Sequence, residues 1–512
     1  DQLLLAALKQ KHVMLRHLGL ANKVVIIDEC HAYDAYMSQY LNVALSWLGA
    51  YQVPVIVLSA TLPAKKRQEI VEAYLSYHFT PTVQNDPLGR GSNEQPRLPD
   101  LITTHKYPLI TYSDGEKISQ KTIRNNTDSR EISLGYVSKD TLTDKLTDLL
   151  SDGGCAGIIV NTVKKAQELT KLLCRCFGDD TVLLIHSRFM APDRAEREKR
   201  LMNELGKLDN SRVRPFLRIV VGTQVLEQSL DIDFDVLISD FCPVDLLLQR
   251  IGRLHRHHRM RPKKLQTALC LLLGTDDDCF EAETEAIYGR YLLMRTKACL
   301  PERLVLPQDI STLVQAVYSE DDSIISGSPD YQRALCDHQR QIDGKEKRAG
   351  DFRIGKPWLE GDIRGWLDTD VDVSEKSGEA AVRDGDESIE VLLVQKRRNG
   401  ILCFLPWIEN GRVLRQDETP DGEQAKTLAR CSVRLPAILC TPWMIDNTIK
   451  ELEKIYNEEL FEWQKSPWLC GQLFLILDEN LTTSLCGYSL SYDQKYGLLY
   501  EKEGETNDSK GI

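Results

Sequence analysis

The chain has 512 residues, of which 42% are hydrophobic and 27% are charged, and this length and composition favour a globular protein of about three domains. A net charge of −12 excludes a protein that coats nucleic acid through its overall charge, but it allows a local basic track. The 14 cysteines form no CxxC pair and no apolar run reaches the roughly 20 residues of a membrane span, so we expect free thiols, no zinc site and a cytoplasmic protein.

Two short apolar runs near the N-terminus, KVVII from Lys23 and PVIVL from Pro54, predict β-strands. Each run is rich in β-branched residues and ends in polar ones, as expected of parallel strands buried on both faces. The spacing of apolar residues predicts helices over 35–48 and 64–76. Residues 80–130 are rich in Pro, Gly, Asn and Thr, and we expect a long irregular connection there.

A second block alternates strands and helices. The predicted strands are 157–161, 182–186, 218–223, 236–240 and 268–273, and the predicted helices are 164–177, 193–205, 225–230 and 244–254. Strict alternation indicates βαβ units and a mostly parallel sheet, so the fold class is α/β. Ligands of such sheets bind beyond the carboxyl ends of the strands, where Asp28-Glu29, Ser59, His186 and Thr223 are found.

The last third of the chain differs in composition. Residues 280–350 are charged and helix-like, and residues 360–390 are acidic with Gly and Ser, which is typical of a linker or mobile loop. From Ile389 the pattern becomes strand-like, and Asn399-Gly400 is a hairpin signal. These features predict a small α+β domain at the C-terminus.

The tetrapeptide Asp28-Glu29-Cys30-His31 follows the first predicted strand. Phosphoanhydride hydrolysis needs a carboxylate to hold magnesium and a base to orient water, and Asp28 and Glu29 have the required chemistry. His31 would transmit the nucleotide state. Acidic residues at a strand end are also often simply solvated, and the four letters alone do not decide between these interpretations.

Two hydroxyl-containing segments also follow strands. Ser59-Ala60-Thr61 could hydrogen-bond the carboxylates, or could form an ordinary turn. Thr223, at a strand-to-helix junction, could bind a nucleic-acid phosphate together with backbone N–H groups, or could be a plain helix cap. Asp231 could hold a nucleotide hydroxyl or an arginine.

The stretch QRIGRLHR at 249–256 supplies guanidinium groups. An ATPase built from two domains needs forked, permanently charged donors for the γ-phosphate, and Arg253 and Arg256 share one helix face. A solvated basic helix is the alternative. The whole basic run from Arg250 to Lys264 could instead contact a DNA backbone.

The order of these motifs decides the interpretation. DExH, SAT, GTQxxEQSLD and QRxGRxHR occur in the same order in superfamily 2 helicases. At finer grain the chain resembles the CRISPR-associated helicase-nuclease of type I systems. The segments that carry this resemblance are DECHAYDAYM at 28–37, LSATLP at 58–63, LIHSRF at 184–189, VGTQVLEQSLDIDFD at 221–235 and CPVDLLLQRIGRLHRHHR at 242–259.

This resemblance implies two RecA-like parallel-sheet domains, the first incomplete, at 1–130 and 131–280. A helical linker with an acidic segment would cover 281–385, and the small α+β domain 386–512. It also implies an ATP- and Mg²⁺-dependent motor that pulls single-stranded DNA for a crRNA-guided surveillance complex. The residues expected to serve catalysis or ATP are Asp28, Glu29, His31, Asp231, Gln249, Arg253 and Arg256, with Asp28 and Glu29 at the metal. Those expected to bind DNA or couple it to ATP are Ser59, Thr61, Asn161, His186, Arg188, Thr223 and Gln224.

Two departures from the family pattern matter. No His-Asp dipeptide of an HD nuclease and no GKS or GKT of a Walker A loop occurs in the sequence. We therefore expect an N-terminally truncated motor that needs an HD and Walker A segment from elsewhere, and negligible ATPase activity of this chain alone. The alternative is a non-catalytic nucleic-acid-binding remnant of a split or truncated gene.

Overall fold

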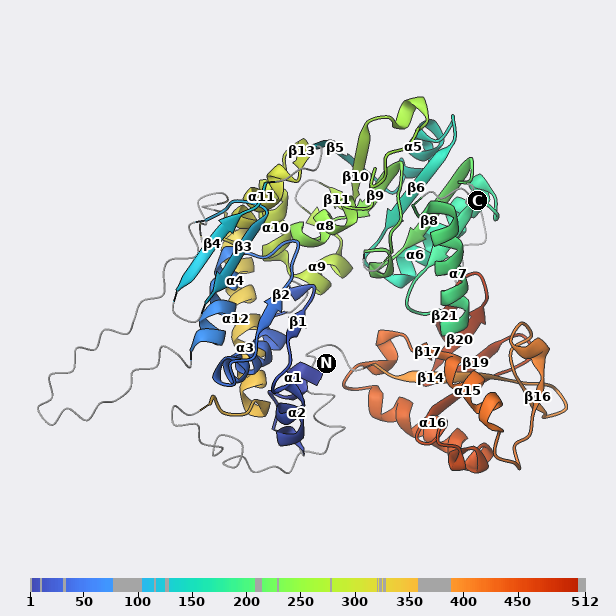
Figure 1. The fold of residues 1–512 in the computed structure, drawn as a ribbon. Coiled ribbons are helices and arrows are strands. Elements are labelled where there is room, and N and C mark those ends of the chain that lie inside the picture. The colour runs from blue at the N-terminus through green and yellow to red at the C-terminus, as the bar shows by residue number, and fades with distance from the viewer. Residues whose placement is uncertain are drawn as a thin grey trace, which may run out of the picture. The chain divides into compact units, whose positions relative to one another are not determined.

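The computed structural model divides the chain into two units (Figure 1). It describes residues 2–9, 12–30, 34–76, 104–114, 117–124, 129–207, 214–227, 230–276, 279–319, 321, 325, 328–357 and 388–504. The first unit comprises Asp1–Ile132, Pro243–Asp245 and Glu285–Gly385, and the second comprises Ser133–Cys242, Leu246–Thr284 and Asp386–Ile512. Among the described residues, no helix has the length and apolar character needed to cross a membrane. The predicted division into four segments stays a prediction.

The first unit contains the two predicted N-terminal strands, β1 (Val25–Ile27) and β2 (Val55–Val57), which pair in parallel. The predicted helices are α3 (Ala35–Ala50) and α4 (Ala64–Leu75), and both pack against each other. The expectation that these strands are buried on both faces is wrong. Ile26 is 63% exposed and Ile56 46%, because the packed core of the described residues, which includes α3, lies against the other face only.

The expected irregular connection over 80–130 is wrong where the structure describes it. A β-hairpin forms there from β3 (Leu109–Ser113) and β4 (Ile118–Thr122). The β-branched and aromatic residues of LITYS suit a pleated strand, and the Pro- and Gly-rich composition of the whole region masked this local signal. Residues 80–103, 115–116 and 125–128 of that range lie outside the described residues.

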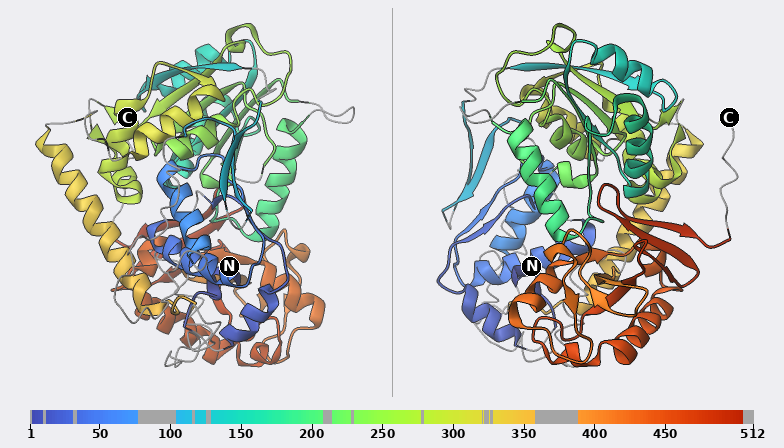
Figure 2. Two further views of the ribbon diagram at one scale, coloured as in Figure 1. Left: turned by 60° about the vertical axis from the view of Figure 1, so that its left-hand side comes forward. Right: turned by 90° about the vertical axis from the view of Figure 1, so that its right-hand side faces the viewer.

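The remaining elements of the first unit are mainly helical, as predicted for 280–350. They are α1 (Gln2–Leu5), α2 (Val13–Leu20), α10 (Arg290–Cys299), β13 (Arg303–Leu306), α11 (Gln308–Tyr318) and α12 (Pro329–Phe352). The long helix α12 packs along α3 and α10 (Figure 2).

Within the second unit, the largest sheet has the strand order β5-β10-β9-β6-β8-β7. Its strands are β5 (Arg130–Val137), β6 (Gly154–Ile159), β7 (Val182–Ile185), β8 (Leu217–Gly222), β9 (Val236–Asp240) and β10 (Ala268–Leu273). The β10–β9, β9–β6, β6–β8 and β8–β7 pairs are parallel, which confirms the predicted parallel sheet. Every residue of β6 and β7 is buried, which explains their continuous apolar runs.

The helices around this sheet largely follow the prediction. They and the short elements are α5 (Leu142–Leu149), α6 (Val163–Phe177), α7 (Ala191–Leu205), η2 (Gln224–Leu226), α8 (Val244–Ile251), η3 (Lys263–Leu265), β11 (Thr275–Asp276), β12 (Cys279–Phe280) and α9 (Ala282–Tyr288). The helix predicted over 225–230 is wrong in extent, since its described part is the single 3-10 turn η2; residues 228–229 lie outside the described residues.

The C-terminal domain (residues 388–504) belongs to the second unit and has its own core around Phe404, Trp463 and Phe474. One sheet has the order β16-β15-β14-β17 with β18 also paired to β14, and a second has the order β19-β20-β21. Asn399 and Gly400 lie in the turn of the β14–β15 hairpin, as predicted, and Gly400 has the positive φ of +81° that such a turn requires. The predicted linker over 360–390 lies outside the described residues up to 387.

The elements of this domain are β14 (Glu390–Lys396), β15 (Leu402–Cys403), η5 (Glu409–Gly411), β16 (Val413–Leu414), α15 (Gly422–Arg430), β17 (Ser432–Arg434), η6 (Ala437–Cys440), α16 (Ile445–Glu459), η7 (Phe461–Lys465), β18 (Leu473–Leu477), β19 (Thr482–Leu485), β20 (Tyr488–Asp493) and β21 (Gly497–Lys502).

Candidate nucleotide and nucleic-acid site

Two carboxylates lie exposed at the carboxyl end of β1. The backbone N–H of Glu29 donates to Asp28 Oδ1 over 2.9 Å, and Glu29 has a φ of +51° that turns the chain sharply. The N–H of Cys30 donates to the carbonyl of Leu58, which joins the ends of β1 and β2. His31 lies outside the described residues.

The donor set at this end fits magnesium better than a metal held by protein ligands alone. Among the described residues, no group of three or more His, Cys, Asp or Glu could hold an ion. Magnesium in nucleotide enzymes commonly takes one or two carboxylates, with waters and substrate phosphates as its other ligands. Asp28 and Glu29 are therefore suited to this role once phosphate is supplied.

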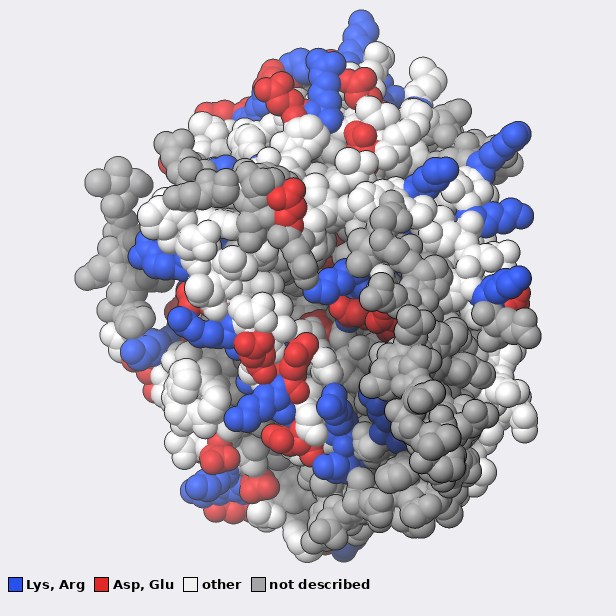
Figure 3. All heavy atoms as spheres, turned by 90° about the vertical axis from the view of Figure 1, so that its left-hand side faces the viewer, with Lys and Arg blue, Asp and Glu red and all other residues white. Residues whose placement is uncertain are grey.

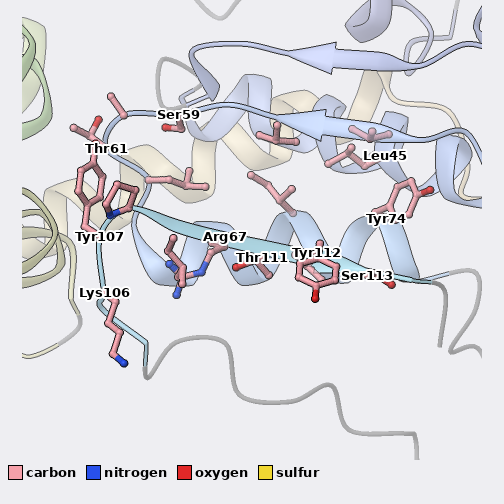
Figure 4. Close-up of a pocket in the computed structure, with 18 of the residues that line it drawn as sticks. Leu45, Ser59, Thr61, Arg67, Tyr74, Lys106, Tyr107, Thr111, Tyr112 and Ser113 are labelled. Atoms are coloured by element: carbon pink, nitrogen blue, oxygen red, sulfur yellow. The ribbon is translucent and has the colours of Figure 1, made fainter. Parts of the chain in front are cut away.

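Ser59 and Thr61 line a cavity of about 800 Å³ in the first unit (Figure 4). Val55 and Val57 of β2 form one wall, and Tyr107 and further residues of the β3 segment form another. Thr61 is 4% exposed, and its Oγ1 has no hydrogen-bond partner among the described residues. A buried hydroxyl without a partner is costly and marks a position at which a further polar group would be stabilising.

At the carboxyl end of the second sheet, the predicted DNA-coupling residues Asn161 and Thr223 are buried, whereas Gln224 is exposed. Thr223 is 2% exposed and Asn161 4%. The Asn161 Nδ2 donates to the carbonyl of Phe241 and to Thr284 Oγ1, both over 2.9 Å. Gln224 Nε2 donates to the backbone carbonyl of Asn161 over 3.3 Å. The Asn161 side chain is thus used within the protein.

Arg250 connects several segments at this end of the sheet, although the motifs did not predict it as a site residue. Arg250 is fully buried, and its guanidinium forms an ion pair with Glu227 at 2.7 Å. It also donates to Asn161 Oδ1, to Ser239 Oγ and to the carbonyl of Asp240. Because these partners belong to three separate segments, Arg250 joins α8 to the ends of β6 and β9 and to the segment after η2.

The two arginines predicted to serve ATP lie just beyond α8. Arg253 Nη2 donates to the backbone carbonyl of Glu227 over 2.7 Å. Arg256 forms an ion pair with Asp231 at 2.5 Å, and the two side chains are 40% and 43% exposed. Burial alone would raise the pKa of Asp231, but the Arg256 hydrogen bond and the nearby charges of His257 and Arg256 hold it below its usual value. Gln249 is half-buried on α8.

Most of the basic run from Arg250 to Lys264 is neutralised within the protein. Asp233 pairs with Arg259 at 2.5 Å and with Arg261 at 2.9 Å, and Asp148 pairs with Lys264 at 2.6 Å. With Arg250 and Arg256, five of the seven Lys and Arg side chains of this run have acidic partners. On the face drawn in Figure 3, basic and acidic side chains are likewise interspersed.

His186 and Arg188 lie against the C-terminal domain. His186 is fully buried; its Nε2 donates to the carbonyl of Tyr496 over 3.1 Å, and its Nδ1 accepts from the N–H of Arg188. Burial lowers the pKa of His186 to about 3, so the ring is neutral near pH 7. The guanidinium of Arg188 lies 5.3 Å from the ring centroid of Tyr500. Their predicted part in DNA binding or coupling stays a prediction.

The chain is similar in sequence to known protein families and to individual proteins. Residues 152–259 match the family described as "CRISPR-associated nuclease/helicase Cas3, C-terminal", and residues 383–498 match the "Cas3 C-terminal domain". The chain is 44% identical to the CRISPR-associated nuclease/helicase Cas3 of Streptococcus thermophilus, over 98% of this chain and 54% of that protein. It is 32% identical to the CRISPR-associated endonuclease/helicase Cas3 of Thermus thermophilus, over 98% of this chain and 56% of that protein.

Solved structures agree with this relationship. The crystal structure of T. fusca Cas3 with ATP has a TM-score of 0.82 and 28% identity, over 98% of this chain and 56% of that one. A CRISPR RNA-guided surveillance complex in a pre-nicking state contains a chain with a TM-score of 0.76 and 27% identity, over 98% of this chain and 59% of that one. The chain spans about half the length of the curated relatives it matches. Over nearly its whole length it is therefore homologous to the Cas3 nuclease/helicases and shares their α/β helicase fold.

Proposed function

We propose that this chain is the greater part of an ATP-driven motor that moves along single-stranded DNA in CRISPR interference. The observation that carries the proposal is the match to Cas3 over 98% of the chain, at 44% identity to one relative. The helicase motifs fall within this match; DExH, SAT and GTQxxEQSLD follow strands of the two parallel sheets, and QRxGRxHR begins on α8.

In this proposal, Asp28 and Glu29 serve magnesium and the attacking water, as their exposed position at the end of β1 permits. Arg253 and Arg256 contact the nucleotide phosphates, with Gln249 and Asp231 beside them. Arg256 already faces a carboxylate, so a phosphate would compete with Asp231 for the same guanidinium. ATP supplies the phosphoanhydride bond whose hydrolysis drives movement; the residues of this chain position and polarise it.

The residues assigned to DNA divide by exposure. Thr61, Asn161, His186 and Thr223 are buried, so we propose that they transmit movement rather than touch the strand. Ser59, Arg188 and Gln224 are more exposed and are the candidates for contact. A structure that resembles this chain comes from a crRNA-guided surveillance complex, and we propose such a complex as the partner that presents the strand.

We further propose that the working motor needs a segment with a Walker A loop and an HD nuclease domain. Neither motif occurs in this sequence, and the relatives are about twice as long as the matched region. The apolar face of β1 and β2, with Val24, Ile26, Ile56 and Leu58 between 46% and 63% exposed, is the surface that such a segment would cover.

The test is hydrolysis of ATP stimulated by single-stranded DNA. We expect no turnover from the chain alone, and turnover after addition of a polypeptide that carries an HD domain and a Walker A loop. Glu29→Gln and Arg256→Ala should abolish that turnover. Arg340→Ala, which removes a more exposed ion pair with Asp337 on α12, should leave it unchanged. No turnover from any soluble mixture would favour the alternative, a non-catalytic nucleic-acid-binding remnant.

A further inference from the structure

The segment that follows β7 contacts the β20–β21 hairpin of the C-terminal domain. The N–H of Leu498 donates to the carbonyl of Arg188 over 3.0 Å, so the segment after β7 adds to the outer edge of β21. The carbonyl of Tyr496, in the hairpin turn, accepts hydrogen bonds from His186 Nε2 and from Gln167 Nε2 on α6. The first contact joins backbone to backbone, and the second joins two side chains beside the second sheet to a backbone carbonyl of the C-terminal domain.

Gly497 allows this approach. It has a φ of +71°, and a Cβ at this position would lie 2.6 Å from the carbonyl oxygen of Arg188 and 2.8 Å from Cε1 of His186. No side chain fits at such distances unless backbone atoms move. The contact is therefore possible only with glycine at the start of β21.

A buried polar cluster lies beside this contact. Asp193, at the start of α7, is 5% exposed and accepts hydrogen bonds from Tyr492 Oη at 2.6 Å and from Trp407 Nε1 at 3.1 Å. Tyr492 Oη in turn accepts from the N–H of Met190. A carboxylate buried in this way is tolerated only while its donors stay in place, so the cluster resists separation of the two parts.

The hydrophobic cores of the C-terminal domain and of the second sheet each also take up a side chain from the other part. Met190, which follows β7, is fully buried in the core of the C-terminal domain. Tyr496, from the hairpin turn, packs on the core of the second sheet. Separation of the two parts would thus expose an apolar side chain from each.

We propose that these contacts, here called the clasp and comprising residues 186–193 with the hairpin 488–502, join the C-terminal domain and the second sheet into one rigid body. Under this inference, His186 and Gln167 are positioning residues for the C-terminal domain. The C-terminal domain then follows every movement of the second sheet. The inference concerns only the fold of this chain and does not depend on its ATPase activity.

The test is amide hydrogen exchange of the whole chain in increasing denaturant. In a rigid body, the amide of Leu498 opens together with the amides of β6 and β8, and not before them. Gly497→Ala should accelerate exchange of Leu498 by at least about tenfold while the amides of β14 and β18 keep their protection.

Gly487→Ala is the matched control, because Gly487 lies in the same domain with a φ of +76° and has no atom near its missing Cβ. Equal exchange of Leu498 in both variants would overturn the proposal. If Gly497→Ala does not fold, the unmodified chain decides: an amide of Leu498 that exchanges well before β6 and β8 open would also overturn it.

Discussion

Replacement of Arg250 by alanine should strongly destabilise the second unit. The change leaves the carboxylate of Glu227, whose side chain is 1% exposed, without its cation, and removes donors from Asn161 Oδ1 and Ser239 Oγ. Loss of one partner from a buried ion pair costs about 3–5 kcal/mol, because an uncompensated charge stays in the interior. We expect a loss in that range.

Arg256→Ala is the control for this experiment. Its ion pair with Asp231 has about 40% of each side chain exposed, and such pairs contribute about 0–1 kcal/mol. The two substitutions remove the same side chain from positions six residues apart, so they differ mainly in burial.

The assay is urea unfolding followed by hydrogen exchange of peptides from β6 and β9. A single midpoint is not defined for a chain with several domains, so the readout must come from the second sheet itself. The double substitution Arg250→Met with Glu227→Leu should recover much of the loss, since no buried charge remains. A loss for Arg250→Ala no larger than that for Arg256→Ala would refute the reasoning.

Three further predictions follow from buried groups. Tyr492→Phe should lower the free energy of unfolding by about 1–3 kcal/mol in denaturant, because it removes a hydrogen-bond donor from Asp193. Burial already raises the pKa of Asp193, so this loss of stability should grow as the pH rises and the carboxyl ionises. A loss that does not change with pH would contradict this. The pKa of His186 is lowered from 6.5 to about 3, so between these values the unfolded chain protonates the imidazole and the folded chain does not. The free energy of unfolding should therefore fall as the pH drops from 6.5 to about 3. His186→Gln should reduce this pH dependence in unfolding curves, and an unchanged pH dependence would argue against a buried neutral ring. Gly157→Ala should cost about 1–3 kcal/mol in thermal or urea unfolding, because its Cβ would lie 2.5 Å from the ring of Phe234. Gly422→Ala meets no atom and has no positive φ, so it should cost less.

The strands of the second sheet were predictable because their sequence signal is local. β9 and β10 coincide with the predicted ranges 236–240 and 268–273, since continuous apolar runs are what burial on both faces selects. β5 carries no comparable run, and its neighbour β10 lies more than 130 residues away in the sequence. Its place in the sheet follows from long-range pairing that periodicity does not record.

The candidate site, too, was predictable from the sequence only in part. The motifs placed Asp28, Glu29 and Thr223 at strand ends, where the structure has them, whereas Arg256 was predicted on a helix and lies beyond the end of α8. The spacing of Arg250, Arg253 and Arg256 does not reveal that only the first is fully buried, because its partner Glu227 comes from a segment 23 residues earlier. Asp233 and Asp235, which both pair with Arg261, lie shortly before the basic run in the sequence and were a signal that this run is neutralised.

The strand order of the large sheet constrains the order in which this chain folds. β6 cannot acquire both neighbours until β9 has been synthesised, and β5 meets β10 only after residue 268. The core that includes Met190 waits for residues up to Leu498. Such non-local closure predicts slow folding, in which the nascent second sheet has unpaired strand edges open to aggregation until β10 has been synthesised.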